Sequence, residues 1–303
     1  MIDIHTLDLK FMGHSQLIAS FLVPCPDGGF ILIETGPAST LEALDAEVAE
    51  AGFSLDDLKG IFLTHVHLDH SAGAGSLAVQ TGAPVFVHPK GANHLIDPSE
   101  KLLPSAERLY GEMMIPLWGV VEPVPKELVV VVQDGDTVEL DGLEIVAHHT
   151  PGHAAHHIAW QIGRAVATGD VGGIRFPGAS HVLPPMPPPD IDVELWYRSI
   201  ERIRIVEPEL LLLTHFGAVE DVGRHLDELE GRLKGWLETT ERVLQAGGDA
   251  QAIGEAILKL DEAEMGQSMV SPAVLERYRK LCPMDANVAG LERYCRKWGR
   301  NIS

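Results

Sequence analysis

The chain has 303 residues, 45% of them apolar and 22% charged, so it can bury a large core and is neither disordered nor fibrous. Its 44 acidic and 23 basic side chains give a formal net charge of -21, which argues against nucleic acid and anionic membranes as partners. Three cysteines without a CxxC spacing, and no stretch that reads as a secretion signal or a membrane span, favour a cytoplasmic protein.

The N-terminal part predicts strands followed by a helix. Over residues 4–33, short apolar stretches separated by Gly and Pro are typical of antiparallel strands. The sequence Ser39-Thr40-Leu41-Glu42 fits a capping box, and the apolar residues after it keep helical spacing until Gly52. We therefore expect a helix that is capped by Ser39 and ends near residue 52.

The middle of the chain alternates strands and helices. Further strands are predicted at residues 60–63, 84–87, 128–132, 137–140, 143–147, 157–162, 165–168 and 210–213, with helices after His70 and over 191–206. Short connections such as Gly163-Arg164 can join only antiparallel neighbours. This order favours a layered α/β sandwich over a purely parallel sheet.

Two segments predict additional helices. Residues 88–125 are too long for a plain loop and rich in apolar side chains, so we expect a helical insertion. It either covers a pocket, pairs with another subunit, or packs on the core. After residue 217, apolar residues step by three and four until Gly247-Gly248. Further helices are expected near 252–260 and from Ser271-Pro272, which together make residues 218–303 a helical extension.

One short string is dense in groups that bind metals. The sequence Thr-His-Val-His-Leu-Asp-His follows an apolar strand and precedes a small-residue helix start. It places four potential ligands within six positions, at His65, His67, Asp69 and His70. Such density is costly unless the groups coordinate an ion, because each would otherwise need its own hydrogen-bond partner. The string therefore indicates a metal site.

Three more candidates lie just past apolar strands, at His153, Asp170 and His215. Each alone is weak evidence, because a histidine at a strand end is more often structural. Together with the first string they make five His and two Asp. This is the complement that two ions need when one carboxylate bridges them and one coordination position holds hydroxide.

This set of residues, HxHxDH followed by separate His, Asp and His, resembles the metallo-beta-lactamase superfamily. The resemblance covers residues 1–217 and implies a four-layer αββα sandwich as the catalytic domain, interrupted by the insertion at 88–125 and followed by the extension at 218–303. It implies one metal on His65, His67 and His153, a second on Asp69, His70 and His215, and Asp170 as the bridge.

Two further positions are implied to support the ligands from outside. The family usually has Asp-x-Gly after an early strand, where this chain has Glu34-Thr35-Gly36, so Glu34 would support the metal loop through a rearranged hydrogen bond. His157, four residues after His153, is expected to support the ligand loop. The Thr-Pro-Gly-His sequence and the helical tail resemble the hydroxyacylglutathione hydrolase and lactonase branches. The whole layout resembles a poorly characterised bacterial and archaeal group.

The resemblance implies a binuclear metal-dependent hydrolase. A hydroxide that bridges two divalent ions would attack a lactone, carboxylic ester, thioester or phosphoester, and Asp69 would orient the hydroxide and pass its proton on. Zinc is the first choice, with iron, manganese and cobalt as alternatives. The second hypothesis is an iron oxidoreductase of the sulfur-dioxygenase kind, which uses one iron.

The proline-rich stretch after Asp170 suggests a substrate pocket. Residues 172–189 contain Phe176, His181 and Met186, and proline would hold such a loop as a rigid apolar wall over the metals. We therefore expect a small-molecule substrate with an apolar part, with His181 as a candidate proton donor. The insertion and the tail could also bury surface between two subunits, which predicts a homodimer.

Overall fold

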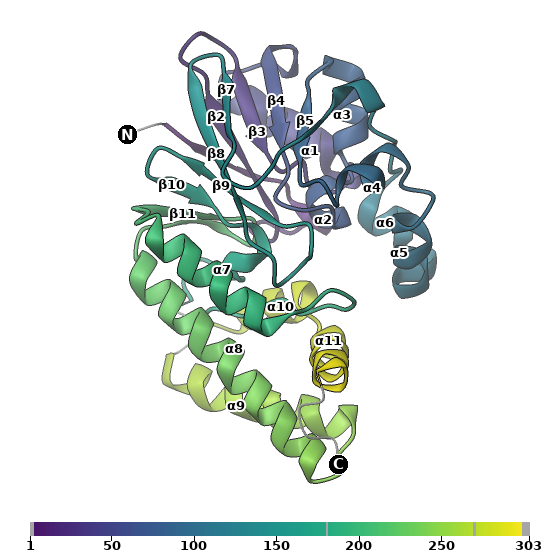
Figure 1. Cartoon of the computed structure of the whole chain (residues 1–303), viewed down its shortest axis with the longest axis vertical. Helices are drawn as coiled ribbons and strands as arrows, with labels where there is room; N and C mark the ends of the chain where they lie inside the picture. The colour runs from purple at the N-terminus through teal and green to yellow at the C-terminus, as the bar shows by residue number, and fades with distance from the viewer. Residues whose placement is uncertain (1–2, 180, 269–270, 299–303) are drawn as a thin grey trace.

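The computed structural model describes residues 3–179, 181–268 and 271–298. Two six-stranded sheets lie face to face in the upper part of Figure 1. In the first sheet, the strands from β1 to β3 pair antiparallel and those from β3 to β6 pair parallel. Its strands follow chain order: β1 (His5–Asp8), β2 (Ala19–Pro24), β3 (Phe30–Ile33), β4 (Leu58–Phe62), β5 (Val85–Val87) and β6 (Val129–Val131).

The second sheet has the strand order β12-β11-β10-β9-β8-β7. All its neighbours pair antiparallel except β10 and β11, which are parallel. Ala165 lies opposite Ile162, which confirms the tight antiparallel connection predicted between them. The strands are β7 (Thr137–Leu140), β8 (Leu143–His149), β9 (Ile158–Ile162), β10 (Ala165–Ala167), β11 (Leu210–Leu213) and β12 (Gly217–Val219).

Alternate side chains of the central strands enter two different cores. In β3, Ile31 and Ile33 pack between the sheets, whereas Phe30 and Leu32 pack in the core that contains the helices. Successive side chains of a strand point to opposite faces, so both faces of this sheet are covered. Between the sheets, Trp160 of β9 meets Phe62 of β4 edge to face, with 5.1 Å between ring centroids. The predicted four-layer αββα sandwich is therefore confirmed.

Helices cover both outer faces of the sandwich. They include α1 (Leu41–Glu50), α2 (Leu68–Ser71), α3 (Ala74–Thr81) and α7 (Val193–Ile205). The capping box predicted for α1 is wrong, because a 3-10 turn precedes the helix. Within that turn Thr40 Oγ1 donates to the Pro37 carbonyl and Ser39 Oγ donates to the Leu117 carbonyl, 78 residues away. Within the described residues, no helix is both long and apolar enough to cross a bilayer.

The insertion at residues 88–125 is helical, as predicted. It contains α4 (Ala92–Ile96), α5 (Leu102–Tyr110) and α6 (Met114–Trp118), which lie beside one edge of the sandwich in Figure 1. Trp118 is buried and stacks on Phe11, with 5.6 Å between ring centroids. By contrast, Leu109 and Ile115 remain exposed. The insertion therefore packs on the body through one face only.

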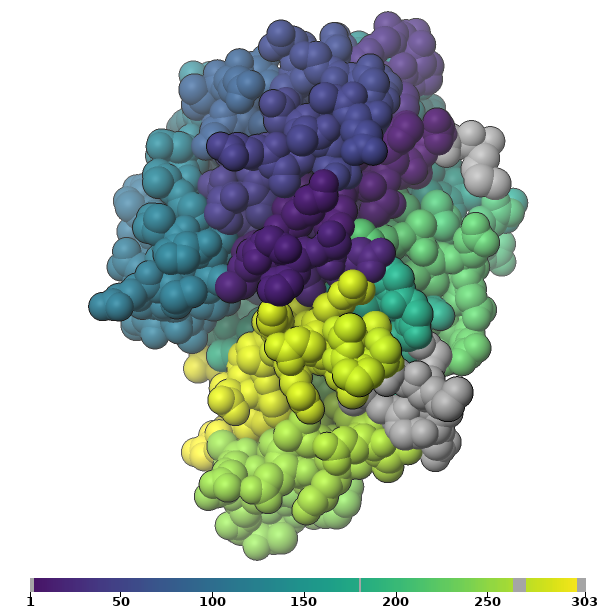
Figure 2. Space-filling model, turned by 180° about the vertical axis from the view of Figure 1, so that it is seen from behind, coloured from purple at the N-terminus to yellow at the C-terminus, as the bar shows by residue number. Residues whose placement is uncertain are grey.

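The C-terminal helices fold back onto the sandwich. They are α8 (Val222–Gln245), α9 (Ala250–Ser268), α10 (Pro272–Leu281) and α11 (Met284–Lys297), and Ser271 caps α10 as predicted, by accepting from the Val274 amide. Figure 2 shows yellow α10 against the purple N-terminal segment, where Arg277 donates to Gln16 at 2.8 Å. Residues 299–303 of the predicted extension lie outside the described residues.

Candidate metal centre

The His65–His70 string forms the turn that follows β4. The backbone leaves the sheet after Phe62, and His67 directly precedes the one-turn helix α2. His65 and His70 are fully buried, whereas Asp69 is partly exposed. The strand places this turn at the edge of the sandwich, and the helix turns Asp69 and His70 toward the same region.

The other three candidates come from the second sheet. His153 follows β8, Asp170 lies in the 3-10 turn η6 (Gly169–Gly172) after β10, and His215 follows β11. All three are buried to 95% or more. The structure thus gathers seven residues from four separate turns into one group, named below the ligand cluster: His65, His67, Asp69, His70, His153, Asp170 and His215.

Three imidazoles form one half of the cluster. Ligand atoms of His65, His67 and His153 all lie within 4.8 Å of one another. The Nδ1 atom of His67 is 2.9 Å from Nε2 of His65 and also 2.9 Å from Nε2 of His153. This half contains three nitrogen atoms that face a common point.

Asp170 joins this half to the other. Ligand atoms of Asp69, His70 and His215 form a second group within 4.8 Å of one another. Oδ2 of Asp170 lies 3.3 Å from Nε2 of His153, in the first half. Its Oδ1 lies 3.2 Å from Nε2 of His70 and 3.3 Å from Nε2 of His215, in the second half. One carboxylate therefore presents one oxygen to each group.

Four of the imidazoles are oriented by an oxygen behind them. Their Nδ1 atoms contact the Thr64 hydroxyl for His65 (3.1 Å), the Glu34 carboxylate for His70 (3.0 Å), the Pro185 carbonyl for His153 (2.8 Å) and the Leu17 carbonyl for His215 (3.0 Å). A carbonyl or carboxylate oxygen can only accept, so Nδ1 of His70, His153 and His215 donates and Nε2 is left to face the cluster. The Thr64 hydroxyl donates to Glu34, so it too accepts from His65. This is the arrangement that orients histidines bound to a metal.

Glu34 links two parts of the first turn. Its carboxylate accepts from the hydroxyl of Thr64, from the Thr64 amide at 3.3 Å and from His70 Nδ1 at 3.0 Å. Glu34 is fully buried with φ 64°, a conformation that an L-residue adopts only when its surroundings hold it there. The longer side chain thus reaches His70 from behind and also fixes the start of the ligand turn.

His157 lies beside the cluster without a hydrogen bond to any ligand atom. Its Nδ1 is 2.9 Å from the Thr150 hydroxyl, and its ring stacks on His65 with 5.1 Å between centroids. Its Nε2 is buried and has no hydrogen-bond partner in the described part of the chain. His157 therefore restrains His65 by packing.

The buried polar atoms of the cluster fit a bound cation. Among the described residues, Nε2 of His70 and Oδ1 of Asp170 are buried without a hydrogen bond, although they lie 3.2 Å apart. In the first half, the lone pairs of His65 and His153 both point at His67, whose Nδ1 carries at most one proton. Unsatisfied buried acceptors are costly, and a divalent cation at each group would satisfy them.

The two halves of the cluster differ in charge. Burial, followed by the nearby His153, lowers the pKa of His67 to about 3. For His215, burial lowers the pKa, but the carboxylates of Asp170 and Asp69 outweigh it and raise the value to about 9. Without an ion, the protonated His215 imidazole therefore balances part of the negative charge of the carboxylates in the second half. A bound cation would supply this positive charge instead.

A pocket of about 240 Å³, named here the apolar pocket, opens onto the cluster at His67, Asp69, Asp170 and His215. Its walls come mainly from the insertion, the proline-rich stretch and the C-terminal helices. They include Phe11, Leu102, Tyr110, Trp118, Ile174, Pro185, Pro187, Leu281 and Asn287. The insertion thus covers a pocket in addition to packing on the core.

The three residues predicted as pocket walls lie elsewhere. Phe176 is fully buried against Tyr278 of α10, with 4.7 Å between ring centroids. His181 is 2.9 Å from the Arg232 guanidinium of α8, and Met186 is fully buried. The C-terminal helices cover this face of the stretch, so neighbouring residues such as Ile174 face the pocket instead. Because His181 contacts Arg232 and does not line the apolar pocket, the geometry does not support it as a proton donor.

The wall residues of the insertion and of the C-terminal helices were not predicted individually. Tyr110 and Trp118 meet edge to face at 5.0 Å on the rim, and Leu281 approaches from α10. Burial raises the pKa of Tyr110 to about 12, with a smaller contribution from Asp69. The apolar content of residues 88–125 predicted that this segment packs against the body or covers a pocket. It did not predict which of its side chains face the pocket.

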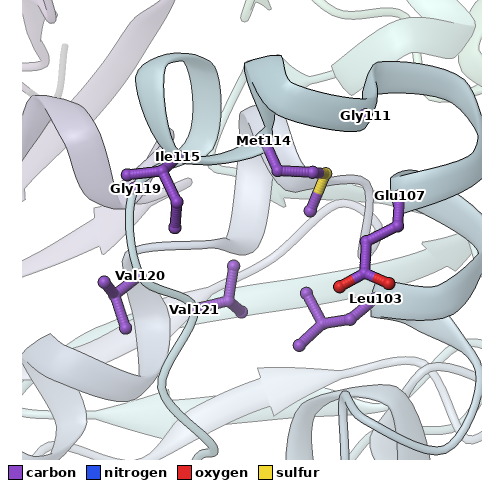
Figure 3. Close-up of a pocket in the computed structure, with 8 residues that line it drawn as sticks. All are labelled: Leu103, Glu107, Gly111, Met114, Ile115, Gly119, Val120 and Val121. Atoms are coloured by element: carbon purple, nitrogen blue, oxygen red, sulfur yellow. The ribbon is translucent and has the colours of Figure 1, made fainter.

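A separate hollow lies within the insertion itself. Figure 3 shows its side chains, among which Leu103, Met114 and Val121 face a space of about 480 Å³. Glu107 is the one ionisable group among the lining residues, and no member of the ligand cluster reaches it. This hollow is therefore not the reactive site.

The predicted homodimer stays a prediction, which a light-scattering mass near twice 32.9 kDa would support.

Comparison with known proteins agrees with this geometry. A model of the metallo-beta-lactamase superfamily matches residues 17–215. The metallo-beta-lactamase fold-containing protein ST1585 of Sulfurisphaera tokodaii is 29% identical over 204 residues, which are 67% of this chain and 74% of that protein. The chain belongs to the metallo-beta-lactamase superfamily. Fold and ligand groups together support a metal-dependent hydrolase in general.

Solved structures extend the likeness in fold beyond the ligand cluster. The archaeal ST1585 structure from Sulfolobus tokodaii has a TM-score of 0.66 at 22% identity, over 96% of this chain and 99% of that chain. A Thermus thermophilus protein, TTHA1429, gives 0.70 at 21% identity, over 98% and 94%. The metallo-beta-lactamase MIM-2 gives 0.53 at 23% identity over 72% and 83%. The first two likenesses include the C-terminal helices.

Proposed function

We propose that this protein is a binuclear metal-dependent hydrolase that uses water to cleave a small ester-like bond, in a lactone, carboxylic ester, thioester or phosphoester. The observation that supports this most is the position of Asp170. One of its oxygens lies 3.3 Å from His153 and the other lies within 3.3 Å of His70 and His215. A carboxylate shared in this way suits two cations a few ångström apart.

When bound, a pair of divalent ions supplies Lewis acidity and lowers the pKa of water toward neutrality. The residues present accept zinc, and equally iron, manganese or cobalt, because the donor set contains imidazoles and carboxylates but no thiolate. His65, His67 and His153 would hold one ion, and Asp69, His70 and His215 the other.

Asp69 is the residue that we assign to proton handling. It lines the apolar pocket, and its Oδ2 lies 3.4 Å from His215 Nε2. Burial raises its pKa, but His70 and His215 outweigh burial and lower it to about 2. Asp69 is therefore ionised at neutral pH and can accept a hydrogen bond from the attacking water. From there the proton passes to the leaving group.

The apolar pocket determines the kind of substrate. Its walls are mostly aliphatic, aromatic and proline side chains, and the cluster residues among them are His67, Asp69, Asp170 and His215. An apolar part of the substrate would displace water from these walls, at about 25 cal/mol per Å² buried. We therefore propose a small molecule in which an apolar group is attached to the scissile bond.

The experiment is a substrate panel with metal content measured on the same protein. The panel contains lactones, thioesters, carboxylic esters, phosphoesters and a β-lactam, the last because MIM-2 has the same fold. Hydrolysis that is abolished by a chelator and restored by a divalent metal, with about two ions per chain, is the expected result. The thioester and lactone members also test the likeness to the hydroxyacylglutathione hydrolase and lactonase branches.

The alternative function has a different signature. An iron enzyme of the sulfur-dioxygenase kind would contain one iron per chain and consume oxygen when given a persulfide. Elemental analysis and an oxygen electrode therefore separate the two hypotheses. Oxygen consumption without hydrolysis of any panel member would overturn the hydrolase proposal.

A further inference from the structure

A second pocket meets the apolar pocket at the ligand cluster. Its volume is about 440 Å³, and its lining shares His67, Leu102, Ser105 and Pro189 with the apolar pocket. The two pockets therefore adjoin on the side of the cluster where His67 lies. A molecule bound at the cluster has room to extend in both directions.

The second pocket differs from the first in its chemistry. Its lining contains the nitrogen donors His94, Lys101, Arg108 and His156, and two carboxylates, Glu100 and Asp190. The carboxylates are partly engaged already. An oxygen of Glu100 lies 4.0 Å from Lys101 Nζ, and an oxygen of Asp190 accepts from the Ala155 amide at 3.4 Å.

Three of the donors, His94, Arg108 and His156, have no such engagement among the described residues. Within the described part of the chain, the Arg108 guanidinium has neither a hydrogen bond nor an ion pair, and the imidazole of His156 has no hydrogen bond. His156 is only 8% exposed, and its Nδ1 is buried and unsatisfied. A buried polar atom without a partner is costly, so its retention beside a cavity points to a ligand.

Arg108 has no partner among the described residues, although carboxylates are abundant in this chain. Acidic side chains outnumber basic ones by 44 to 23, so a carboxylate is the commonest charged neighbour that an arginine could find. Its planar guanidinium presents paired N–H donors that match the two oxygens of a carboxylate. Arg108 lies on α5 and faces the pocket beside the cluster instead of a protein acid.

We propose that the second pocket binds a carboxylate group of the substrate, with Arg108 as its main donor and His156 as a second donor. The substrate class is then an ester or thioester with an apolar acyl chain on one side of the scissile bond and a carboxylate on the other. This inference rests on the proposed function for the scissile bond. The carboxylate site itself depends only on residues of the second pocket.

Two pairs of probes separate binding from hydrolysis. The hydrolysable pair is 4-(hexanoyloxy)benzoate and its methyl ester, which differ by one negative charge. The second pair, 4-(hexanoylamino)benzoate and its methyl ester, has an amide in place of the scissile ester. Calorimetric titration of the metal-loaded protein with the amides measures affinity whether or not the protein is a hydrolase.

The variant to test is Arg108→Ala, with Arg198→Ala as its matched control. Both arginines are exposed on helices and have no partner among the described residues, but Arg198 on α7 lines neither pocket. Loss of Arg108 should weaken binding of the anionic amide, and raise KM for the anionic ester, by about fivefold to tenfold. Values for the neutral partners, and all values for Arg198→Ala, should stay within twofold.

The outcomes distinguish the two claims. Selective loss of the anionic probes in Arg108→Ala supports the carboxylate site, even if neither ester is hydrolysed, and in that case only the hydrolase assignment fails. Equal loss for charged and neutral probes would overturn the carboxylate site, because it would reflect packing alone. Hydrolysis of both esters with no effect of Arg108→Ala would overturn it as well and leave the hydrolase assignment standing.

Discussion

The strand-end turns and the added helices make different contributions to this site. Every member of the ligand cluster comes from a turn that follows a strand of the sandwich. The pocket walls come largely from the insertion at 88–125, the stretch after η6 and the C-terminal helices. This division separates the groups suited to chemistry from those suited to selectivity.

Burial separates the imidazoles of the cluster from the rim of the apolar pocket, although other wall residues such as Ile174 are buried. His65 and His70 are fully buried, and each is fixed by an oxygen behind its ring. In the walls, Leu109 is 62% and Tyr110 39% exposed. Substitution in the walls should therefore change which substrate fits without loss of the fold, whereas substitution in the cluster should remove the reaction itself.

The largest effect is expected from Asp170→Ala. Removal of the carboxylate that faces both halves should lower the hydrolytic rate by several orders of magnitude and reduce metal content. Circular dichroism should remain unchanged, because the turn is held by its backbone and by Trp196, whose Nε1 donates to Val171 at 2.9 Å. Asp45→Ala, at an exposed position of α1, is the control. Activity near that of the wild type would refute the mechanism.

A smaller effect is expected behind the cluster, at Glu34. Glu34→Gln keeps the size of the side chain but removes the negative charge that faces His70 Nδ1 at 3.0 Å. Loss of such an outer partner costs about tenfold to a hundredfold in metal affinity. Competition with a chelator would measure the change. If Glu34→Gln binds metal as tightly as the wild type, the carboxylate acts only on the fold of the turn.

A change in the wall tests the other side of the comparison. Leu109→Trp adds bulk at the rim of the apolar pocket, where the side chain is already mostly exposed. We expect KM for hexanoyl esters to rise about tenfold, because the added ring would occupy part of the space that the chain needs. A tenfold change corresponds to ~1.4 kcal/mol, which is a small part of the free energy with which such a chain binds. KM for acetyl esters and the metal content should not change. Leu258→Trp, on α9, is the matched control.

The ligand cluster and the pocket walls also differ in how well the sequence predicted them. The His65–His70 string was recognisable because its four ligand types lie in one turn after an apolar strand. Strand positions followed from local alternation and from Gly and Pro. The distant ligands, by contrast, were only weak candidates from their positions after apolar strands, since a lone histidine such as His215 has no local signature. Family resemblance implied their roles.

Features that depend on distant contacts were not predictable from local pattern. Phe176 was expected at the pocket, yet Tyr278 from 102 residues further along the chain covers it. Ser39 matches a capping box in sequence, but its hydroxyl donates to the Leu117 carbonyl of the insertion. In both cases local chemistry allowed two partners, and tertiary packing selected the distant one.

The smallest effect concerns the contact between the extension and η6, the turn that contains Asp170. His225 of α8 donates from Nε2 to the Gly172 carbonyl of η6 at 2.7 Å, and burial lowers its pKa to about 4. The unfolded chain has an ordinary value near 6.5 and binds a proton that the folded chain excludes. The contribution of His225 to stability is therefore largest above pH 6.5, falls as the pH decreases from 6.5 toward 4, and then levels off.

His225→Gln keeps a donor for the Gly172 carbonyl but does not titrate. Between pH 7.5 and 5.5, the wild type should lose about 1 kcal/mol more free energy of unfolding than this variant, as measured by urea denaturation. The other buried histidines titrate in both proteins, so the difference isolates His225. Parallel pH profiles would mean that His225 is exposed to water in the native protein. The extension would then be held to η6 less tightly than its helices are held to one another.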